Sequence, residues 1–309
     1  MLNLYVAIWR ASGRRQMVLI ALSVFIAALA AVPLEFQKRI INLLGARGAG
    51  LEDLLLLGAG MMGAILLSLG LKWLSGYRSG LLGEDLIRLI RTRLVATAAD
   101  QSGDSRLPTG TLATAVTAEA EELGKFAGSA FSEPVVQVGT LISVVGYIAT
   151  TQPKLGAIAL AMIVPQMVLV YLSQIRVNAL LADRVRVLRR ASNGITGDDL
   201  RDLEQQVLAD FDSIYETRRR MFIWKLSTKF LLSTINGVGT VTVLTLGGWM
   251  ALQGLTDVGT VVAAATGLSR IQGPTAFMIA FYRQVSANRV KFELLRDLLD
   301  TREFPVARA

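Results

Sequence analysis

Histidine and cysteine, which most often carry nucleophilic and metal chemistry, are both absent from the 309 residues. Their absence excludes a Ser-His-Asp triad, a thiol nucleophile, imidazole or thiolate metal sites and disulfide bonds. The carboxylates do not fill this gap, because Glu35, Glu133 and Asp257 lie at the ends of apolar runs and no acidic residue lies in the middle of one. We therefore expect no catalytic residue, no bound cofactor and no metal ligand in this chain.

Among the polar side chains inside the apolar runs, one cation and four amides are candidates for a transport pathway. Arg270 interrupts the run 258–282. A charge at bilayer depth costs roughly 2.5–3.5 kcal/mol on insertion scales, so Arg270 should face protein or a cavity. It would contact an anionic substrate there, or instead satisfy backbone carbonyls near Gly273 and Pro274 or reach toward the membrane surface. The amides either line a transport pathway or form hydrogen bonds between helices; they are Gln137, Gln166, Asn236 and Gln272.

The elements that must position these side chains are long apolar runs. The chain is 52% hydrophobic and only 18% charged, and its mean hydropathy is +0.49. A bilayer-spanning helix needs about 20 mostly apolar residues. Runs of that kind predict six transmembrane helices at 16–34, 54–71, 135–152, 155–175, 231–256 and 258–282.

The basic residues predict the orientation of these spans. The net charge is +8, and 27 of the 32 Lys and Arg residues fall in the terminal segments and the connections 72–134 and 176–230. Because Lys and Arg accumulate on the cytoplasmic side, both termini and both long connections are predicted to be cytoplasmic. This topology accounts for the positive charge without a nucleic-acid partner, and the lipid bilayer is the expected environment.

Both long connections carry apolar residues at helical spacing on either side of a Gly- and Ser-rich break. The pattern predicts two cytoplasmic helical hairpins that continue the second to fifth spans. Before the first span, Leu4, Val6, Ile8 and Trp9 predict an amphipathic segment at the membrane interface.

Three local patterns accompany this layout. Residues 252–261 form a short glycine-bearing turn followed by Val-Gly-Thr-Val, and 271–274 read Ile-Gln-Gly-Pro ahead of the exit segment 279–300. Residues 108–112 read Pro-Thr-Gly-Thr-Leu and precede Glu119, Glu121 and Glu122. Taken in this order, the patterns and the six runs resemble the transmembrane domain of ABC exporters over residues 1–300, with 301–309 as a tail.

The resemblance implies an all-α membrane fold and a dimer in which the second hairpin reaches the partner subunit. It also implies that the hairpin tips couple the spans to nucleotide-binding domains. The matching coupling residues are Pro108, Thr109, Gly110 and Leu112 in the first tip and Asn193, Asp198 and Asp199 in the second.

The motifs of the ATPase motor are missing from the sequence. No G-x-x-x-x-G-K-[ST] loop is present, and the single Gly-Lys pair, Gly124-Lys125, is followed by Phe126. We therefore expect ATP and magnesium to be bound by a separately encoded nucleotide-binding protein, and this chain not to be an enzyme.

These features favour a permease-type subunit of an ABC transporter, in a homodimer or a heterodimer with a similar chain. The expected location is a bacterial inner membrane. The second hairpin looks shorter than is usual for the family, so an alternative is a structural or assembly subunit without a motor. An ion-coupled carrier is disfavoured by the lack of an acidic residue within a span.

Overall fold

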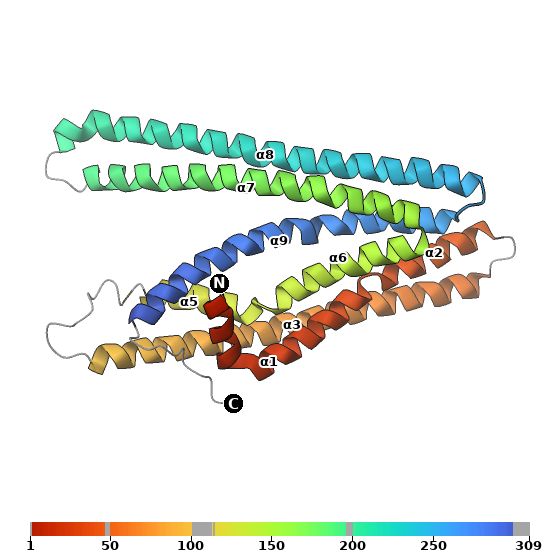
Figure 1. Ribbon diagram of the computed structural model, residues 1–309, viewed down its shortest axis with the longest axis horizontal. Coiled ribbons are helices and arrows are strands. Elements are labelled where there is room, and N and C mark those ends of the chain that lie inside the picture. Colours follow the sequence, from red (N-terminus) through yellow and green to blue (C-terminus); the bar gives the residue numbers. More distant parts are fainter. Residues whose placement is uncertain (1, 47–49, 101–112, 114, 196–199, 299–309) are drawn as a thin grey trace.

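The computed structural model describes residues 2–46, 50–100, 113, 115–195 and 200–298, and these are almost entirely helical (Figure 1). The elements in chain order are α1 (Leu2–Leu29), α2 (Val32–Gly45), α3 (Leu51–Asp100), the π-helix η1 (Ala115–Glu119), α5 (Ala120–Ser129), α6 (Ser132–Thr151), α7 (Pro153–Ile195), α8 (Leu200–Leu252) and α9 (Val258–Leu298).

The long helices run side by side along one axis of the molecule (Figure 1). The α6–α7 and α8–α9 connections, the end of α2 and the start of α3 lie at one end, which we call the short-loop end. The other end, where α3, α7 and α9 finish and α8 begins, we call the hairpin end. Because α3 and α8 contain 50 and 53 residues, a rise of 1.5 Å per residue makes them about 75–80 Å long. A hydrocarbon core of about 30 Å leaves much of each helix outside the bilayer.

Within the described residues, five helical segments are long and apolar enough to cross a membrane. Each contains all or most of one of the first five apolar runs, and the fifth run ends at Leu252 rather than at residue 256; the segments are Leu2–Gly45, Leu51–Ala99, Ala115–Thr151, Pro153–Leu180 and Phe211–Leu252. The sixth run lies in α9, which is continuous but less apolar because it contains Arg270, Gln272 and the Gly273–Pro274 pair.

Two helices break where the sequence pattern predicts continuity. The first apolar run divides at Ala30 and Ala31, and α2 starts with Pro33 in its first turn. The third span does not continue straight into the first hairpin, because α5 ends at Ser129 and α6 starts anew at Ser132. Proline fits the first turn of a helix but removes a hydrogen bond from a helix interior, and Pro33 and Pro134 lie just after these two breaks.

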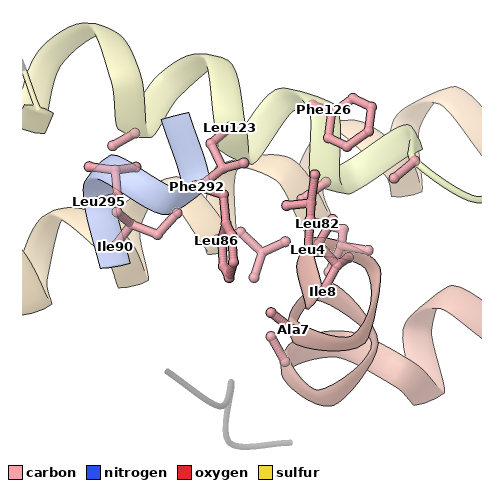
Figure 2. Close-up of a cluster of buried hydrophobic side chains, with 14 of the residues drawn as sticks. Leu4, Ala7, Ile8, Leu82, Leu86, Ile90, Leu123, Phe126, Phe292 and Leu295 are labelled. Carbon is pink, nitrogen blue, oxygen red and sulfur yellow. The ribbon is translucent and has the colours of Figure 1, made fainter. Parts of the chain in front are cut away.

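A hydrophobic core at the hairpin end joins α1, α3, α5 and α9 (Figure 2). The backbone of α1 kinks at Ser12, and the segment before the kink buries Leu4 and Ile8 against Leu82 and Phe126. Val6 and Trp9 remain exposed. Leu4 and Ile8 therefore pack on protein, whereas Val6 and Trp9 lie on the opposite side of the helix, so the four residues do not form one apolar face.

A second core lies at the short-loop end and joins α2, α6, α7, α8 and α9. Its buried residues include Leu34, Val144, Ile148, Met162 and Leu268. Of the described helices, only α9 contributes to both cores, with residues 263–271 in the second core and residues 281–295 in the first.

Helices α7 and α8 pack against each other along their length but meet the rest of the chain mainly toward the short-loop end (Figure 1). There they contact α6 and α9. Toward the hairpin end α9 turns away to pack on α5, and Phe292 and Leu295 join the first core. The outer half of the α7–α8 pair thus diverges from its own bundle.

Candidate functional site

A cavity of about 700 Å³ lies between the two cores. Its walls come from the junction of α1 and α2, from α3, from the start of α6 and from the middle of α9. Helix α3 packs on α1, α2 and α5, whereas α6 packs on α1, α7 and α9, so α3 and α6 form opposing walls. The cavity exists because the two packed clusters do not meet at this level.

The polar lining comes from helical stripes. On α3, Ser68, Lys72, Ser75 and Ser79 recur at steps of four, three and four residues, which places them on one face. On α6 the lining follows the same rule and consists of Ser132, Glu133, Val136, Gln137 and Thr140. Apolar side chains complete the walls, and the largest of these are Ile26, Leu29, Ile65 and Leu69.

Arg270 enters the cavity from α9 and is held by the break between α1 and α2. Its Nη1 donates to the backbone carbonyl of Ala30 at 3.1 Å. In an unbroken helix that carbonyl would accept from the N–H of Leu34, but this N–H donates to Ala31 at 2.9 Å instead. The guanidinium therefore satisfies a carbonyl that the break has released.

The depth of the cavity follows from helical rise. Arg270 lies twelve residues into α9, or about 18 Å from the short-loop end, and Lys72 lies about 32 Å along α3. The exposed rings of Trp73 and Tyr77 stack next to Lys72 with their centroids 5.8 Å apart. Aromatic pairs of this kind mark membrane interfaces. The cavity thus extends from mid-bilayer depth to the boundary nearer the hairpin end.

The charges in the cavity do not cancel. Arg270 and Lys72 contribute two positive charges, and Glu133 is the one acidic residue among the lining side chains that the structure describes. Within the described residues no ion pair joins Arg270, Lys72 and Glu133, and the hydrogen-bond partner of Arg270 is a neutral carbonyl. The cavity carries a net positive charge as a result.

The structure brings together only two of the five candidate pathway residues. Gln137 and Arg270 line the cavity, whereas Gln272 is half-buried on α9 outside its lining. Gln166 is buried in α7, and Asn236 has an enclosed Oδ1 without a hydrogen-bond partner among the described residues. The hydrogen bond from Thr228 to Ser173 sets the α7–α8 register, which puts residue 166 level with 235–236. These two amides therefore belong to the α7–α8 pair.

The predicted coupling residues lie outside the described part of the chain. Pro108, Thr109, Gly110 and Leu112 fall in 101–112, and Asp198 and Asp199 fall in 196–199. Asn193 belongs to the last turns of α7, and its side chain is also outside the description.

Sequence reasoning missed most of the polar lining. It used Lys72 only as a marker of orientation and Glu133 only as a residue at a span end. The period of the serines on α3, which runs from Ser68 inside the predicted span to Ser79 beyond it, is the signal that would have found this wall, because polar residues at helical spacing indicate a water-facing stripe.

Comparison with known protein families gives a match over residues 16–275 to the ABC transporter transmembrane region. A search of curated proteins returned no match. The family match confirms the resemblance over residues 16–275 and, with the helical structure, the predicted fold class.

Proposed function

The chain belongs to the ABC transporter transmembrane family, and from this premise we propose that it is the membrane subunit of a transporter driven by a separately encoded ATPase. In this proposal it pairs with a second membrane subunit, either another copy or a similar chain. Substrate passes between the helices by alternating access, with Arg270 and Gln137 on its path. Gln166, Asn236 and Gln272 have structural roles.

The observation that carries the proposal is the reach of the helices beyond the bilayer. The short-loop end has connections of only a few residues, so its helix termini lie near one membrane surface. Helices α3, α7 and α8 then project on the opposite side by several tens of ångströms. Such projections suit the transfer of motion from a motor protein to the spans.

The distribution of basic residues supports a cytoplasmic hairpin end. A motor that uses cytoplasmic ATP would dock there, at the tips around 106–112 and 193–203. The sequence has no Walker A motif, so ATP and magnesium are assigned to the partner. A bacterial inner membrane is the proposed location.

The divergence of α7 and α8 supports pairing with a second membrane subunit. The outer halves of α7 and α8 have only each other to pack on in the described structure. Exposed apolar residues such as Phe222, Leu226 and Phe230 lie on α8. A neighbouring bundle would cover part of this surface.

The test is purification of the chain from its native membrane in a mild detergent. We expect a nucleotide-binding protein to co-purify, and the complex to hydrolyse ATP and to move substrate in vesicles only when ATP is supplied. Stable recovery with a complex that contains no ATPase would contradict the proposal and support the structural-subunit alternative. Uptake that follows a proton gradient without ATP would support a carrier.

A further inference from the structure

The cavity between α3 and α6 is a binding site with a defined charge preference. We infer that it takes an amphipathic organic anion, whose negative group binds at Arg270 and whose apolar part lies between α3 and α6. The binding site itself does not depend on the proposed function. The inference rests on that function only where it assigns such anions as the transported substrates.

The first argument is the uncompensated charge at Arg270. A guanidinium has five N–H donors, and Arg270 uses one nitrogen for the carbonyl of Ala30. That carbonyl is neutral, so it satisfies a donor without neutralising the charge. A cation about 18 Å below the short-loop end is costly when unpaired, and a bound carboxylate, sulfonate or phosphate would relieve this cost. Charge-assisted hydrogen bonds are also stronger than neutral ones.

The second argument is the shape and lining of the cavity. Its volume of about 700 Å³ lies within the range of small-molecule sites, roughly 300–1,000 Å³. Gln137 and Thr140 line the cavity at about the same depth as Arg270 and can donate further hydrogen bonds to an anion. Between the levels of Arg270 and Lys72 the lining includes the apolar side chains of Ile26, Leu29 and Leu69, which would hold the organic part of the ligand.

The third argument is that the site is held in place before any ligand arrives. The bond from Arg270 to Ala30 links the middle of α9 to the α1–α2 break, 240 residues apart. Pro33 and Pro274, both in the lining, restrict the backbone on either side. A site fixed in this way loses little conformational entropy on binding.

The second cation sets the direction of the ligand. Lys72 lies nearer the hairpin end than Arg270 does, about 14 Å from its level along the helix axes, and the lining continues past Lys72 to Ser75 and Ser79. Glu133 lies between the two levels. Lys72 therefore attracts anions toward the hairpin-end part of the cavity, whereas Arg270, which forms no ion pair within the described residues, retains them.

The inference can be tested on the full chain alone, in nanodiscs of zwitterionic phosphatidylcholine. Three probes share one ring system and differ in charge: naphthalene-2-sulfonate, neutral naphthalene-2-sulfonamide and 2-naphthyltrimethylammonium. Equilibrium dialysis, with empty nanodiscs as the blank, measures binding. We expect saturable binding of the sulfonate, about one per chain, at least tenfold tighter than that of the other two probes.

The variants Arg270→Gln and Lys72→Gln locate the site. Arg270→Gln should weaken sulfonate binding at least tenfold and leave the sulfonamide unchanged, and Lys72→Gln should weaken the sulfonate about threefold. The matched control is Arg219→Gln, because Arg219 lies on α8 in an exposed pair with Glu216. Should Arg270→Gln fail to fold, Gln137→Leu replaces it, with the same expected selectivity for the sulfonate.

Equal binding of the three probes would overturn the inference, and so would cavity variants that bind the sulfonate as tightly as the unchanged chain. Because these measurements use no ATPase, they are separate from the test of the proposed function. Failure to co-purify with an ATPase would contradict the proposed function but not the anion site. Transport of cations by an active complex would refute the anion site but not the proposed function.

Discussion

Arg270 has a structural contact that its position in the sequence does not reveal. Three roles were open from sequence: contact with an anionic substrate, satisfaction of backbone carbonyls near Gly273 and Pro274, or a reach toward the membrane surface. The structure places its hydrogen bond at Ala30 instead, on a different helix. Arg270 therefore satisfies a backbone carbonyl, but that carbonyl lies at the α1–α2 break next to Pro33 rather than near Pro274. The remaining N–H donors of its guanidinium are available to a ligand.

This contact predicts a stability effect at Arg270. Replacement by Met keeps most of the side-chain length but leaves the carbonyl of Ala30 without a donor, which should cost about 1–2 kcal/mol. Arg270→Lys keeps a donor and should cost less. Thermal unfolding in detergent, followed by tryptophan fluorescence, measures the difference. Arg219→Met serves as an exposed control, and an Arg270→Met variant as stable as this control would refute the assigned contact.

Asp257 forms the N-terminal cap of α9 at the short-loop end. Its Oδ1 accepts from the backbone N–H of Thr260 at 2.7 Å, and its Oδ2 accepts from the Thr260 hydroxyl at 2.7 Å. Asn42 of α2 donates to the same carboxylate and accepts from the N–H of Gly259. Partial burial works to raise the pKa of Asp257, but these hydrogen bonds and the nearby Lys38 outweigh it, and the net pKa is lowered.

The lowered pKa of Asp257 predicts a pH-dependent contribution to stability. Since the folded pKa lies below the unfolded value, the contribution is present above the ordinary carboxyl range and is lost as the pH falls through the folded pKa. Asp257→Ala should cost about 0.5–2 kcal/mol at neutral pH through loss of the cap. The measurement is Tm at a series of pH values from neutral to acidic. The difference in Tm between the unchanged chain and Asp257→Ala should narrow on acidification. A difference that widens would contradict the lowered pKa of Asp257.

At the scale of elements, the first hairpin depends on close packing between α3 and α5. Gly124 and Gly128 of α5 face the backbone of α3 near Ser79 and Gly83, and a Cβ atom at either position would overlap Ile87 or the carbonyl of Ser79. Gln16 of α1 completes this junction by donating to the carbonyl of Ala127 at 2.8 Å, just before the break between α5 and α6.

Substitution at Gly128 tests this packing. Gly128→Ala should destabilise the chain even though alanine favours a helix over glycine by about 1 kcal/mol, because the backbone of α3 has to move away. Gly80→Ala on α3 is the matched control, since no atom lies within 4 Å of its added Cβ. The control should be neutral or slightly more stable in thermal unfolding. If both variants behaved alike, the close α3–α5 contact would be refuted.

At the scale of the molecule, the separation of α7 and α8 from the bundle predicts contact with another membrane chain. A photo-crosslinking amino acid at Phe222, in the outer half of α8, should give products between two chains. The same residue at Trp249, exposed on α8 near the short-loop end, should give far fewer. Mass spectrometry on a mixture of isotope-labelled and unlabelled protein identifies a second copy as the partner. A complete lack of interchain products, in the native membrane as in the purified protein, would contradict the prediction.

The sequence by itself determined the class of the molecule. Apolar runs of about 20 residues require a bilayer whatever the tertiary arrangement, and five of the six occur in helices that meet the length and composition of a span. The turn at 252–261 was also readable, because Asp257 and Gly254, which has a φ of +73°, act within a few residues of one another. Features that depend on local chemistry were therefore predictable.

The tertiary structure alone decided the site. Helical spacing shows that Ser68, Ser75 and Ser79 share a face, but it does not show that this face lies opposite Gln137 or near Arg270. The pairing of Arg270 with Ala30 depends on two separate helices meeting at a break that the apolar pattern of 16–34 conceals. Periodicity fixes the polar faces of each helix, whereas only packing between distant helices determines which of those faces enclose a common cavity.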